Sequence, residues 1–379
     1  MKLGLLGILR APVVTPLALA FFALATQGCG CSDDEEPQAH GGAAGKAGSG
    51  GSAGKGGTGA SAGVGGTGGA SGSAGQGGGA GSGSLSIEKA AEANSPFDAT
   101  PSPDGKTVYF TAVDPAQSLA GVFQVAASGG SVTPLHVGSP FSSPFGIATS
   151  SDGQKLFVAD VGAEWTDGAG KVSDTGQILS LPASGAAPSG VPGTAGMQPR
   201  GLELRNANGA DEIVFSGVDA QSGAPNVFQI ASAGGTAAPL APASSLSDPS
   251  GIAIAQNGDV YVADSTGAET RRASVLLVKG GAVTTIASDL PVGYPVGIAL
   301  AMGDTALFVS GLDPATLNDV VYSIDLATKA QTRFTGAGAI DISKFQESAG
   351  LHRAKNANVF AWADSRANTA GTVYLVTIQ

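Results

Sequence analysis

Short apolar runs alternate with turn-forming residues all along positions 85–379. The stretch Asp248–Thr266, DPSGIAIAQNGDVYVADST, shows this most clearly, because apolar runs at Gly251–Ala255 and Asp259–Ala263 flank the tripeptide Gln256-Asn257-Gly258. Runs of Ile, Val, Ala and Tyr on both sides of an Asn-Gly turn predict two antiparallel strands joined as a hairpin. Gly or Pro interrupts the chain too often for helices, and no long helical periodicity is present. The pattern therefore predicts an all-β region.

This hairpin is one copy of a unit that recurs six times. Each copy opens with Pro-x-Gly and an apolar pair, and the third position of this motif falls at 98, 146, 201, 251, 297 and 350. The first and last copies are degenerate, Pro96-Phe97-Asp98 and Ser348-Ala349-Gly350. The second run of every copy ends in an aspartate: Asp114, Asp160, Asp219, Asp264, Asp313 and Asp364. Self-similarity at this period indicates a repeat architecture.

Two further strands follow each of these aspartates. They are clearest in VFQVAASGGSVTPL (Val122–Leu135) and VFQIASAGGTAAPL (Val227–Leu240), which are identical at eight of fourteen positions with an offset of 105 residues. Six units of four short strands predict a six-bladed β-propeller. The last unit ends with its third strand, Thr372–Gln379, so we expect Leu85–Ala93 to supply the fourth, with residues 85–91 pairing with 372–379.

The N-terminal residues have a different character. Residues 1–28 combine a basic start with a short apolar stretch that prolines interrupt, which is typical of an export signal rather than a membrane-spanning helix. They end at Gly28-Cys29, a junction that resembles the lipobox of bacterial lipoproteins; in that family the cysteine becomes the lipid-bearing N-terminus. Thr26 departs from the pattern, since the family prefers leucine there. Cleavage after Ala23-Leu24-Ala25, which would give an unlipidated secreted protein, is the alternative.

Residues 29–84 are rich in Gly, Ala and Ser and have little apolar surface to offset the entropy of ordering. Their composition therefore predicts a disordered tether.

Cys29 and Cys31 are the only cysteines, which excludes metal or redox chemistry that needs a cysteine within residues 85–379. The net charge of −11 also resides in residues 85–379. Nucleic acid is thereby disfavoured as a partner. We expect a monomer that contacts a membrane through its lipid anchor alone.

The repeat also carries a family resemblance. P-x-G-I-A followed by N-G-D-V-Y-V-A-D-S resembles the repeats of NHL propellers and of the SMP-30/gluconolactonase group, and Ser102–Ala112, SPDGKTVYFTA, is similar to TolB-type repeats. The resemblance implies the propeller architecture and leaves function open, because such propellers include binders, scaffolds, hydrolases and lyases.

The gluconolactonase resemblance implies a divalent metal held by Glu, Asn and Asp beside the repeat glycine. A hard cation needs several oxygen ligands. The residues before that position here are Phe97, Phe145, Arg200, Ser250, Val296 and Ala349. The metal ligands of that group are therefore not found, and we expect no cofactor. One carboxylate, Asp98, leaves a divalent cation and a metal-dependent lactonase or hydrolase in the channel as the alternative.

Two candidate sites remain. The repeated aspartates are better explained as strand-end hydrogen-bond acceptors than as catalysts, and the region lacks a G-x-S-x-G motif. Two positions after the repeat glycine, however, the third unit has Glu203 and the sixth has His352, which would face each other across a six-fold ring. With Arg200 nearby they predict a charged constriction of the channel that binds an ion or water; the alternative is that backbone groups satisfy each of them locally.

The second candidate is the loop Val161–Gln177, the longest one after a repeat aspartate, which carries Glu164, Trp165 and Asp167. A tryptophan among acidic residues can stack on a sugar or anchor a protein partner.

The sequence thus predicts a lipid-anchored propeller in the bacterial cell envelope that binds an envelope protein, a glycan or a small molecule at its rim and catalyses no reaction.

Overall fold

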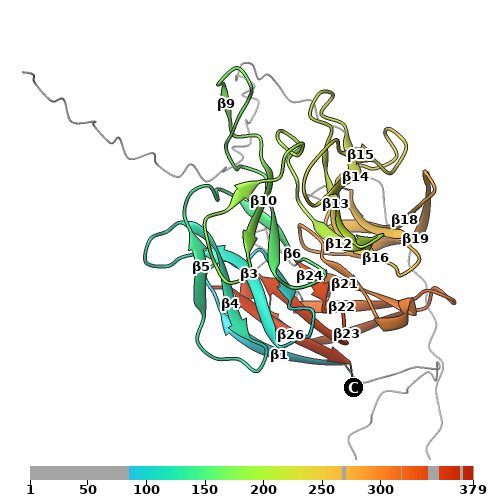
Figure 1. Cartoon of the computed structure of the whole chain (residues 1–379). Helices are drawn as coiled ribbons and strands as arrows, with labels where there is room; N and C mark the ends of the chain where they lie inside the picture. Colours follow the sequence, from blue (N-terminus) through green and yellow to red (C-terminus); the bar gives the residue numbers. More distant parts are fainter. Residues whose placement is uncertain (1–84, 267–269, 317, 340–349, 368–369, 379) are drawn as a thin grey trace, which may run out of the picture. The chain divides into compact units, whose positions relative to one another are not determined.

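Six four-stranded antiparallel sheets make up the computed structural model, which describes residues 85–266, 270–316, 318–339, 350–367 and 370–378. The sheets are arranged as the blades of a propeller around a central channel (Figure 1). The predicted six-bladed fold is confirmed. The signal segment 1–28, the tether 29–84 and Cys29 lie outside the described residues.

Each blade runs from an inner strand at the channel to an outer strand at the circumference. Blade 1 holds β2 (Asp98–Pro101), β3 (Thr107–Val113), β4 (Ala120–Ala126) and β5 (Thr133–Val137). Blade 2 holds β6 (Pro144–Thr149), β7 (Lys155–Asp160), β10 (Gln177–Pro182) and β11 (Ser189–Gly190). Blade 3 holds β12 (Leu202–Ala207), β13 (Ala210–Val218), β14 (Pro225–Ala231) and β15 (Ala238–Pro239).

The second half of the ring repeats this order. Blade 4 holds β16 (Pro249–Ile254), β17 (Val260–Ser265), β18 (Arg272–Lys279) and β19 (Ala282–Pro291). Blade 5 holds β20 (Ile298–Leu300), β21 (Ala306–Leu312), β22 (Asn318–Asp325) and β23 (Gln331–Ala339), with a single 3-10 turn at Met302–Asp304. Blade 6 holds β24 (Leu351–Arg353), β25 (Val359–Asp364), β26 (Thr372–Ile378) and β1 (Leu85–Glu92).

The two ends of the propeller meet in blade 6. Strand β1 pairs antiparallel with β26 from Leu85 opposite Ile378 to Glu92 opposite Thr372. The predicted pairing of the first and last strands is confirmed, with Gln379 outside the described residues. Because β1 covers the outer edge of β26, this blade is completed by both ends of the propeller domain.

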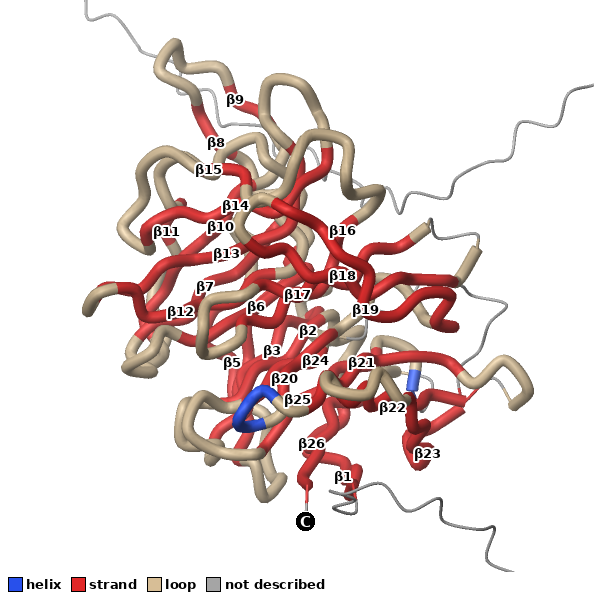
Figure 2. The backbone as a smooth tube through the Cα atoms, turned by 90° about the vertical axis from the view of Figure 1, so that its right-hand side faces the viewer, coloured by secondary structure: helices blue, strands red, loops and turns tan. Residues whose placement is uncertain are grey.

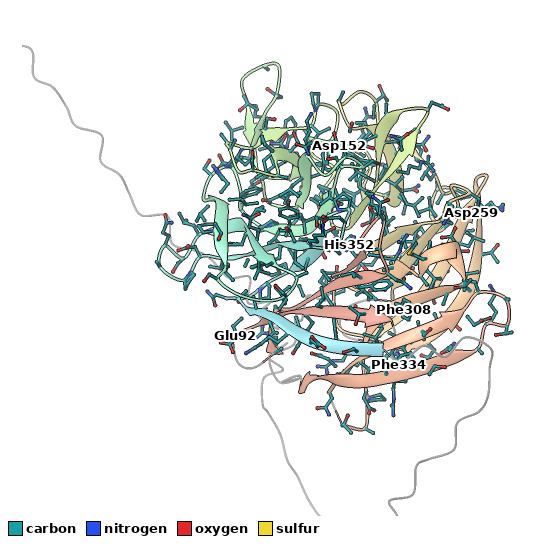
Figure 3. All side chains as sticks on the ribbon, turned by 60° about the horizontal axis from the view of Figure 1, so that its bottom comes forward. Glu92, Asp152, Asp259, Phe308, Phe334 and His352 are labelled. Carbon is teal, nitrogen blue, oxygen red and sulfur yellow. The ribbon has the colours of Figure 1, made fainter. Side chains whose placement is uncertain are left out.

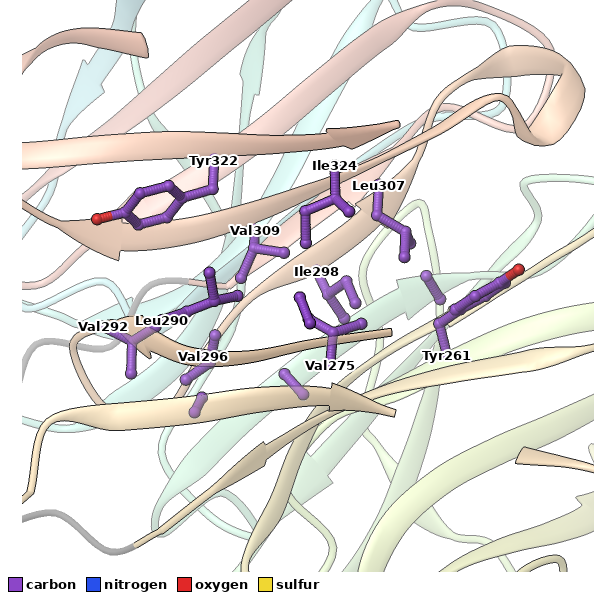
Figure 4. Packing of buried hydrophobic residues seen from close by; sticks show 14 of the residues in the cluster. Tyr261, Val275, Leu290, Val292, Val296, Ile298, Leu307, Val309, Tyr322 and Ile324 are labelled. Atoms are coloured by element: carbon purple, nitrogen blue, oxygen red, sulfur yellow. The ribbon is translucent and has the colours of Figure 1, made fainter. Parts of the chain in front are cut away.

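The hydrophobic core lies between neighbouring blades. Figure 4 shows the contact between blades 4 and 5, where Val275 and Ile298 pack with Leu307, Val309 and Tyr322. These side chains are at most 8% exposed, and burying each aliphatic one stabilises the fold by roughly 1.5–3 kcal/mol. Among the described residues, no helix is long and apolar enough to span a bilayer.

The glycine of the Pro-x-Gly motif is required by the close approach of adjacent inner strands. A Cβ atom at Gly146 would lie 2.2 Å from the backbone oxygen of Arg200 in the next blade, and one at Gly201 would lie 2.1 Å from that of Ser250. The same substitution at Gly251 would bring a Cβ atom within 2.3 Å of the following blade. Side chains cannot be accommodated at such distances, so the motif sets the narrow bore of the channel.

The repeated aspartates accept hydrogen bonds from backbone amides at the ends of their strands. Asp160 accepts from the amides of Ser142 and Ser143, which lead into the inner strand of its own blade, at 2.9 Å each. Asp264 has the same role in blade 4. The others accept from amides of the loops that follow them: Asp114, Asp219, Asp313 and Asp364. The interpretation of these residues as strand-end acceptors is confirmed.

We call the end of the propeller that carries the Pro-x-Gly starts and the loops after the repeat aspartates the top face. The opposite end, with the turns between the first and second strands of each blade, is the bottom face. A small hairpin, β8 (Trp165–Thr166) and β9 (Val172–Ser173), rises from blade 2 on the top face (Figures 1 and 2).

Candidate functional site

Four charged side chains meet inside the channel, and we call them the channel network: Asp98, Glu203, His352 and Lys355. Asp98 opens β2 in blade 1, Glu203 is in β12 of blade 3, and the two cations come from blade 6, where His352 is in β24 and Lys355 is in the turn after it. His352 lies near the centre of the ring (Figure 3). The three residues predicted from the repeat's irregularities are therefore brought together.

His352 bridges the two carboxylates. Its Nε2 lies 2.9 Å from Oδ2 of Asp98, and its Nδ1 lies 3.3 Å from Oε2 of Glu203. Lys355 closes the other side, with its Nζ donating to Oε1 of Glu203 at 2.7 Å and to the backbone oxygen of Leu204 at 3.0 Å. Side-chain exposure is 3% for Asp98, 6% for His352, 16% for Glu203 and 20% for Lys355.

Backbone amides also donate hydrogen bonds to the two carboxylates. Oδ1 of Asp98 accepts from the amide of Ala99 at 2.8 Å, and its Oδ2 also accepts from the amide of Ile147 in blade 2 at 2.8 Å. Oε1 of Glu203 accepts from the amide of Leu204 at 2.8 Å. Backbone amides together with His352 and Lys355 therefore satisfy these carboxylates. Binding of an ion or a water molecule in the channel stays a prediction.

The network favours its charged forms. Burial opposes a charge on His352, but Asp98 and Glu203 on either side outweigh it and raise the imidazole pKa to about 10. For Glu203, burial works against ionisation, and the ammonium of Lys355 together with His352 overcomes it and holds the carboxyl pKa well below its usual range. At neutral pH His352 is therefore an imidazolium that donates from both nitrogens. Two carboxylates and two cations leave the network neutral.

Asp98 replaces the repeat glycine because blade 6 leaves room for it. A Cβ atom at Gly350 would lie 1.6 Å from Oδ1 of Asp98, so the glycine of blade 6 makes space for the carboxylate of blade 1. Asp98 also bonds to His352 in blade 6 and to Ile147 in blade 2. One side chain therefore connects three blades beside the point where the ring closes.

Asp98 and His352 of the network line a small cavity in the channel, with Arg200 also in its lining. Between the network and the top face the channel is lined mainly by glycines and aliphatic residues and has room for about one water molecule. Each carboxylate oxygen of Asp98 and Glu203 already accepts a hydrogen bond, and among the described residues no group of three or more His, Cys, Asp or Glu is placed to hold a metal ion. Both carboxylates are thus engaged in ion pairs and in hydrogen bonds from backbone amides.

Above the network, Arg200 lies at the channel mouth in a fixed orientation. Its Nη1 donates to Oδ1 of Asp248 and, at 2.6 Å, to the hydroxyl of Tyr294, whose ring lies 5.8 Å from the guanidinium carbon. Burial raises the pKa of the Tyr294 hydroxyl to about 12, which keeps it protonated. Beside Arg200 in the ring, Phe145 of blade 2 stacks on Phe97 of blade 1 with ring centroids 5.6 Å apart.

The predicted rim residues form a separate feature in the hairpin β8–β9. Trp165 donates from Nε1 to the hydroxyl of Thr175 at 3.0 Å. Asp167 accepts from two amides at the hairpin turn, so its carboxylate is structural. Glu164 is exposed. The described hydrogen bonds of these residues stay within the loop Val161–Gln177, and none reaches the channel network.

Several residues of the site were not predicted from the sequence. Lys355 and Tyr294 lie outside the positions compared between repeats, and Asp248 directly precedes Pro249. The tyrosine also directly precedes a Pro-x-Gly motif, so comparing the residues before each motif would have indicated both mouth residues.

Comparison with known proteins supports the architecture. The NHL repeat family model matches residues 246–268, which include the inner hairpin of blade 4 and confirm the resemblance to NHL repeats. No curated protein matches the sequence. The chain is thus a six-bladed β-propeller that carries an NHL repeat.

Three solved structures show the fold. Regucalcin from Agrobacterium tumefaciens, a calcium-binding protein, has a TM-score of 0.52 at 13% identity over 78% of this chain and 94% of its own. A protein of unknown function from Dyadobacter fermentans has a TM-score of 0.51 at 14% identity over 78% of this chain and 98% of its own. A chain of the nidogen/laminin complex has a TM-score of 0.50 at 18% identity over 66% of this chain and 93% of its own.

Proposed function

We propose that the protein is a lipid-anchored, extracytoplasmic binding module whose top face holds an envelope protein and which catalyses no reaction. The observation that supports this most strongly is the small size of the cavity above the channel network. A substrate would find room for about one water molecule above the channel network, and His352 keeps its proton at neutral pH because two carboxylates flank it.

The top face offers the features that recognition needs. Its loops carry the raised hairpin β8–β9, on which Val172 is 57% exposed and Trp165 is half-buried. An exposed aliphatic residue on a projecting hairpin, next to an amphipathic aromatic ring, is typical of a protein-binding surface. The nidogen/laminin likeness shows that this fold also occurs in a protein complex.

The location belongs to the same proposal. Cys29 in its lipobox-like context would carry the lipid, and residues 29–84 would serve as the leash between the membrane and the propeller. The test is fractionation of cells that express the full chain or its Cys29→Ser variant. The proposal expects the full chain in the membrane fraction and the variant in the soluble extracytoplasmic fraction; identical fractionation of both would contradict the anchor.

Binding at the top face is tested by photo-crosslinking in cells. A benzophenone amino acid replaces Val172 on the top-face hairpin, and the matched control places it at Met302, which is 48% exposed on the bottom face. We expect one discrete protein adduct from position 172 and none from position 302. Equal adducts from both positions, or none from position 172, would count against the proposal.

A further inference from the structure

The mouth of the channel contains a guanidinium group that is held in place but only partly used. Arginine has five N–H donors. Both hydrogens of Nη1 of Arg200 are engaged, one by Asp248 and one by Tyr294. Among the described residues, neither its Nε nor its Nη2 has a hydrogen-bond partner, and its side chain is 27% exposed. The unoccupied edge is the one that binds a carboxylate through two parallel hydrogen bonds.

This arrangement lowers the entropic cost of binding. Asp248 and Tyr294 fix one end of the guanidinium, and the tyrosine ring also lies against it. An arginine on an open surface would lose rotamer entropy when a ligand immobilises it, whereas Asp248 and Tyr294 already hold the guanidinium of Arg200. Arg205 does use the same edge at a similar exposure of 26%, because its Nε and Nη2 both donate to Oε2 of Glu212, at 2.7 and 2.6 Å.

Apart from Asp248 and Tyr294, the channel mouth around Arg200 is lined mainly by apolar residues and glycines. Arg200 is the one charged residue among the described residues that precede the repeat glycine, and its neighbour around the ring is Phe145, which stacks on Phe97. Both rings are half-buried and therefore present part of their surface to a ligand. The narrow channel below excludes a bulky group, so a ligand would lie across the mouth with its apolar part on the phenylalanines.

We infer that the channel mouth is a binding site for a small carboxylate with a flat apolar body, with the carboxylate on the Nε–Nη2 edge of Arg200 and the body against Phe145 and Phe97. This inference rests on the proposed function in one respect, that the top face is the binding face. It adds a small-molecule site at the centre of that face. Because Asp248 already pairs with Arg200, we expect a minimal ligand to bind weakly.

Phenylacetate serves as the probe, titrated into the purified full chain and followed by calorimetry or ligand-observed NMR. Saturable binding of phenylacetate, with at least about tenfold weaker binding of phenylacetamide, supports the site, because the amide lacks the charge that Arg200 pairs with. Arg200→Gln should weaken binding about tenfold or more. The matched control Arg333→Gln removes an exposed arginine from the outer strand of blade 5, where it pairs with Asp313, and should leave binding unchanged.

A second variant keeps the inference testable if Arg200→Gln fails to fold. Tyr294→Phe retains the ring and removes the hydroxyl that orients Arg200, so it should weaken phenylacetate binding several-fold. No saturable binding to the natural chain, or equal binding by Arg200→Gln and the natural chain, would overturn the site. If one of these two results is found together with a crosslinked adduct specific to position 172, the carboxylate site at the mouth is wrong and the proposed binding of a protein at the top face is supported. If phenylacetate binds but no such adduct forms, the carboxylate site is supported and the proposed binding of a protein is contradicted.

Discussion

Replacing His352 by glutamine removes the cation that separates two buried carboxylates. In the native chain the imidazole pKa rises from 6.5 to about 10, as Asp98 and Glu203 outweigh the cost of burial. A folded pKa above the unfolded one means that the stabilisation is complete below pH 6.5 and is lost as the pH rises through about 10. Since each pH unit of this interval is worth about 1.4 kcal/mol, the full contribution is roughly 5 kcal/mol.

The assay is urea unfolding from pH 6 to 10.5, followed by tryptophan fluorescence. Trp362, fully buried in blade 6 beside the ring closure, contributes to this signal together with Trp165. At pH 6 the His352→Gln variant should be less stable than the native chain by up to about 5 kcal/mol. The difference should shrink steadily above pH 6.5 and nearly vanish above pH 10. The variant also retains both carboxylates, so it reports the loss of the cation alone.

His136→Gln is the matched control. His136 lies in the outer strand of blade 1, and its imidazole contacts the backbone oxygen of Ser139 at 2.8 Å. Among the described residues no hydrogen bond or ion pair joins it to a carboxylate. Its stability difference from the native chain should not follow the course of the His352 variant. Parallel stability curves for the native chain and His352→Gln across the whole pH range would refute the reasoning, since they would show that His352 carries no extra proton in the folded state.

Three further outcomes follow from the geometry. Gly146→Ala should destabilise the protein by about 3 kcal/mol or more in urea unfolding, because its Cβ atom would lie 2.2 Å from the backbone oxygen of Arg200. Glu203→Gln should cost about 3 kcal/mol at neutral pH by leaving Lys355 without its carboxylate, and because the Glu203 pKa is depressed, this difference should fall as the medium is acidified below pH 4.5. Deleting residues 85–92 should expose the edge of β26 and produce aggregates in size-exclusion chromatography.

The blades could be predicted from the sequence because their signals are local. An Asn-Gly turn, a Pro-x-Gly start and a terminal aspartate each specify a few neighbouring residues, and repetition at similar spacing multiplies the evidence. The hairpin β8–β9 was missed for the same reason: its residues, Trp165 to Ser173, are mostly polar or glycine and show no apolar period. It was predicted only as a long loop.

The candidate site could be predicted only where it breaks the repeat. Asp98, Glu203 and His352 stand at positions that are Gly or small in the other units, so their difference marked them. Lys355 sits in a turn of variable sequence, where a lysine is unremarkable. Its contact with Glu203 spans 152 residues and depends on blades 3 and 6 facing each other across the channel. Such a contact forms only when the ring of blades closes, so no pattern in the sequence around Lys355 or Glu203 indicates it.

The central claim is that the charges of the channel are satisfied by each other and leave the propeller to act by binding. The most direct test is the divalent metal content of the purified full chain, measured by elemental analysis after gel filtration. We expect far less than one divalent ion per chain, because the imidazolium of His352 and the ammonium of Lys355 already pair with Asp98 and Glu203, and the described residues place no group of three His, Cys, Asp or Glu to hold a metal ion. One tightly bound ion per chain that is lost in Asp98→Asn would contradict it and favour a metal-dependent hydrolase in the channel.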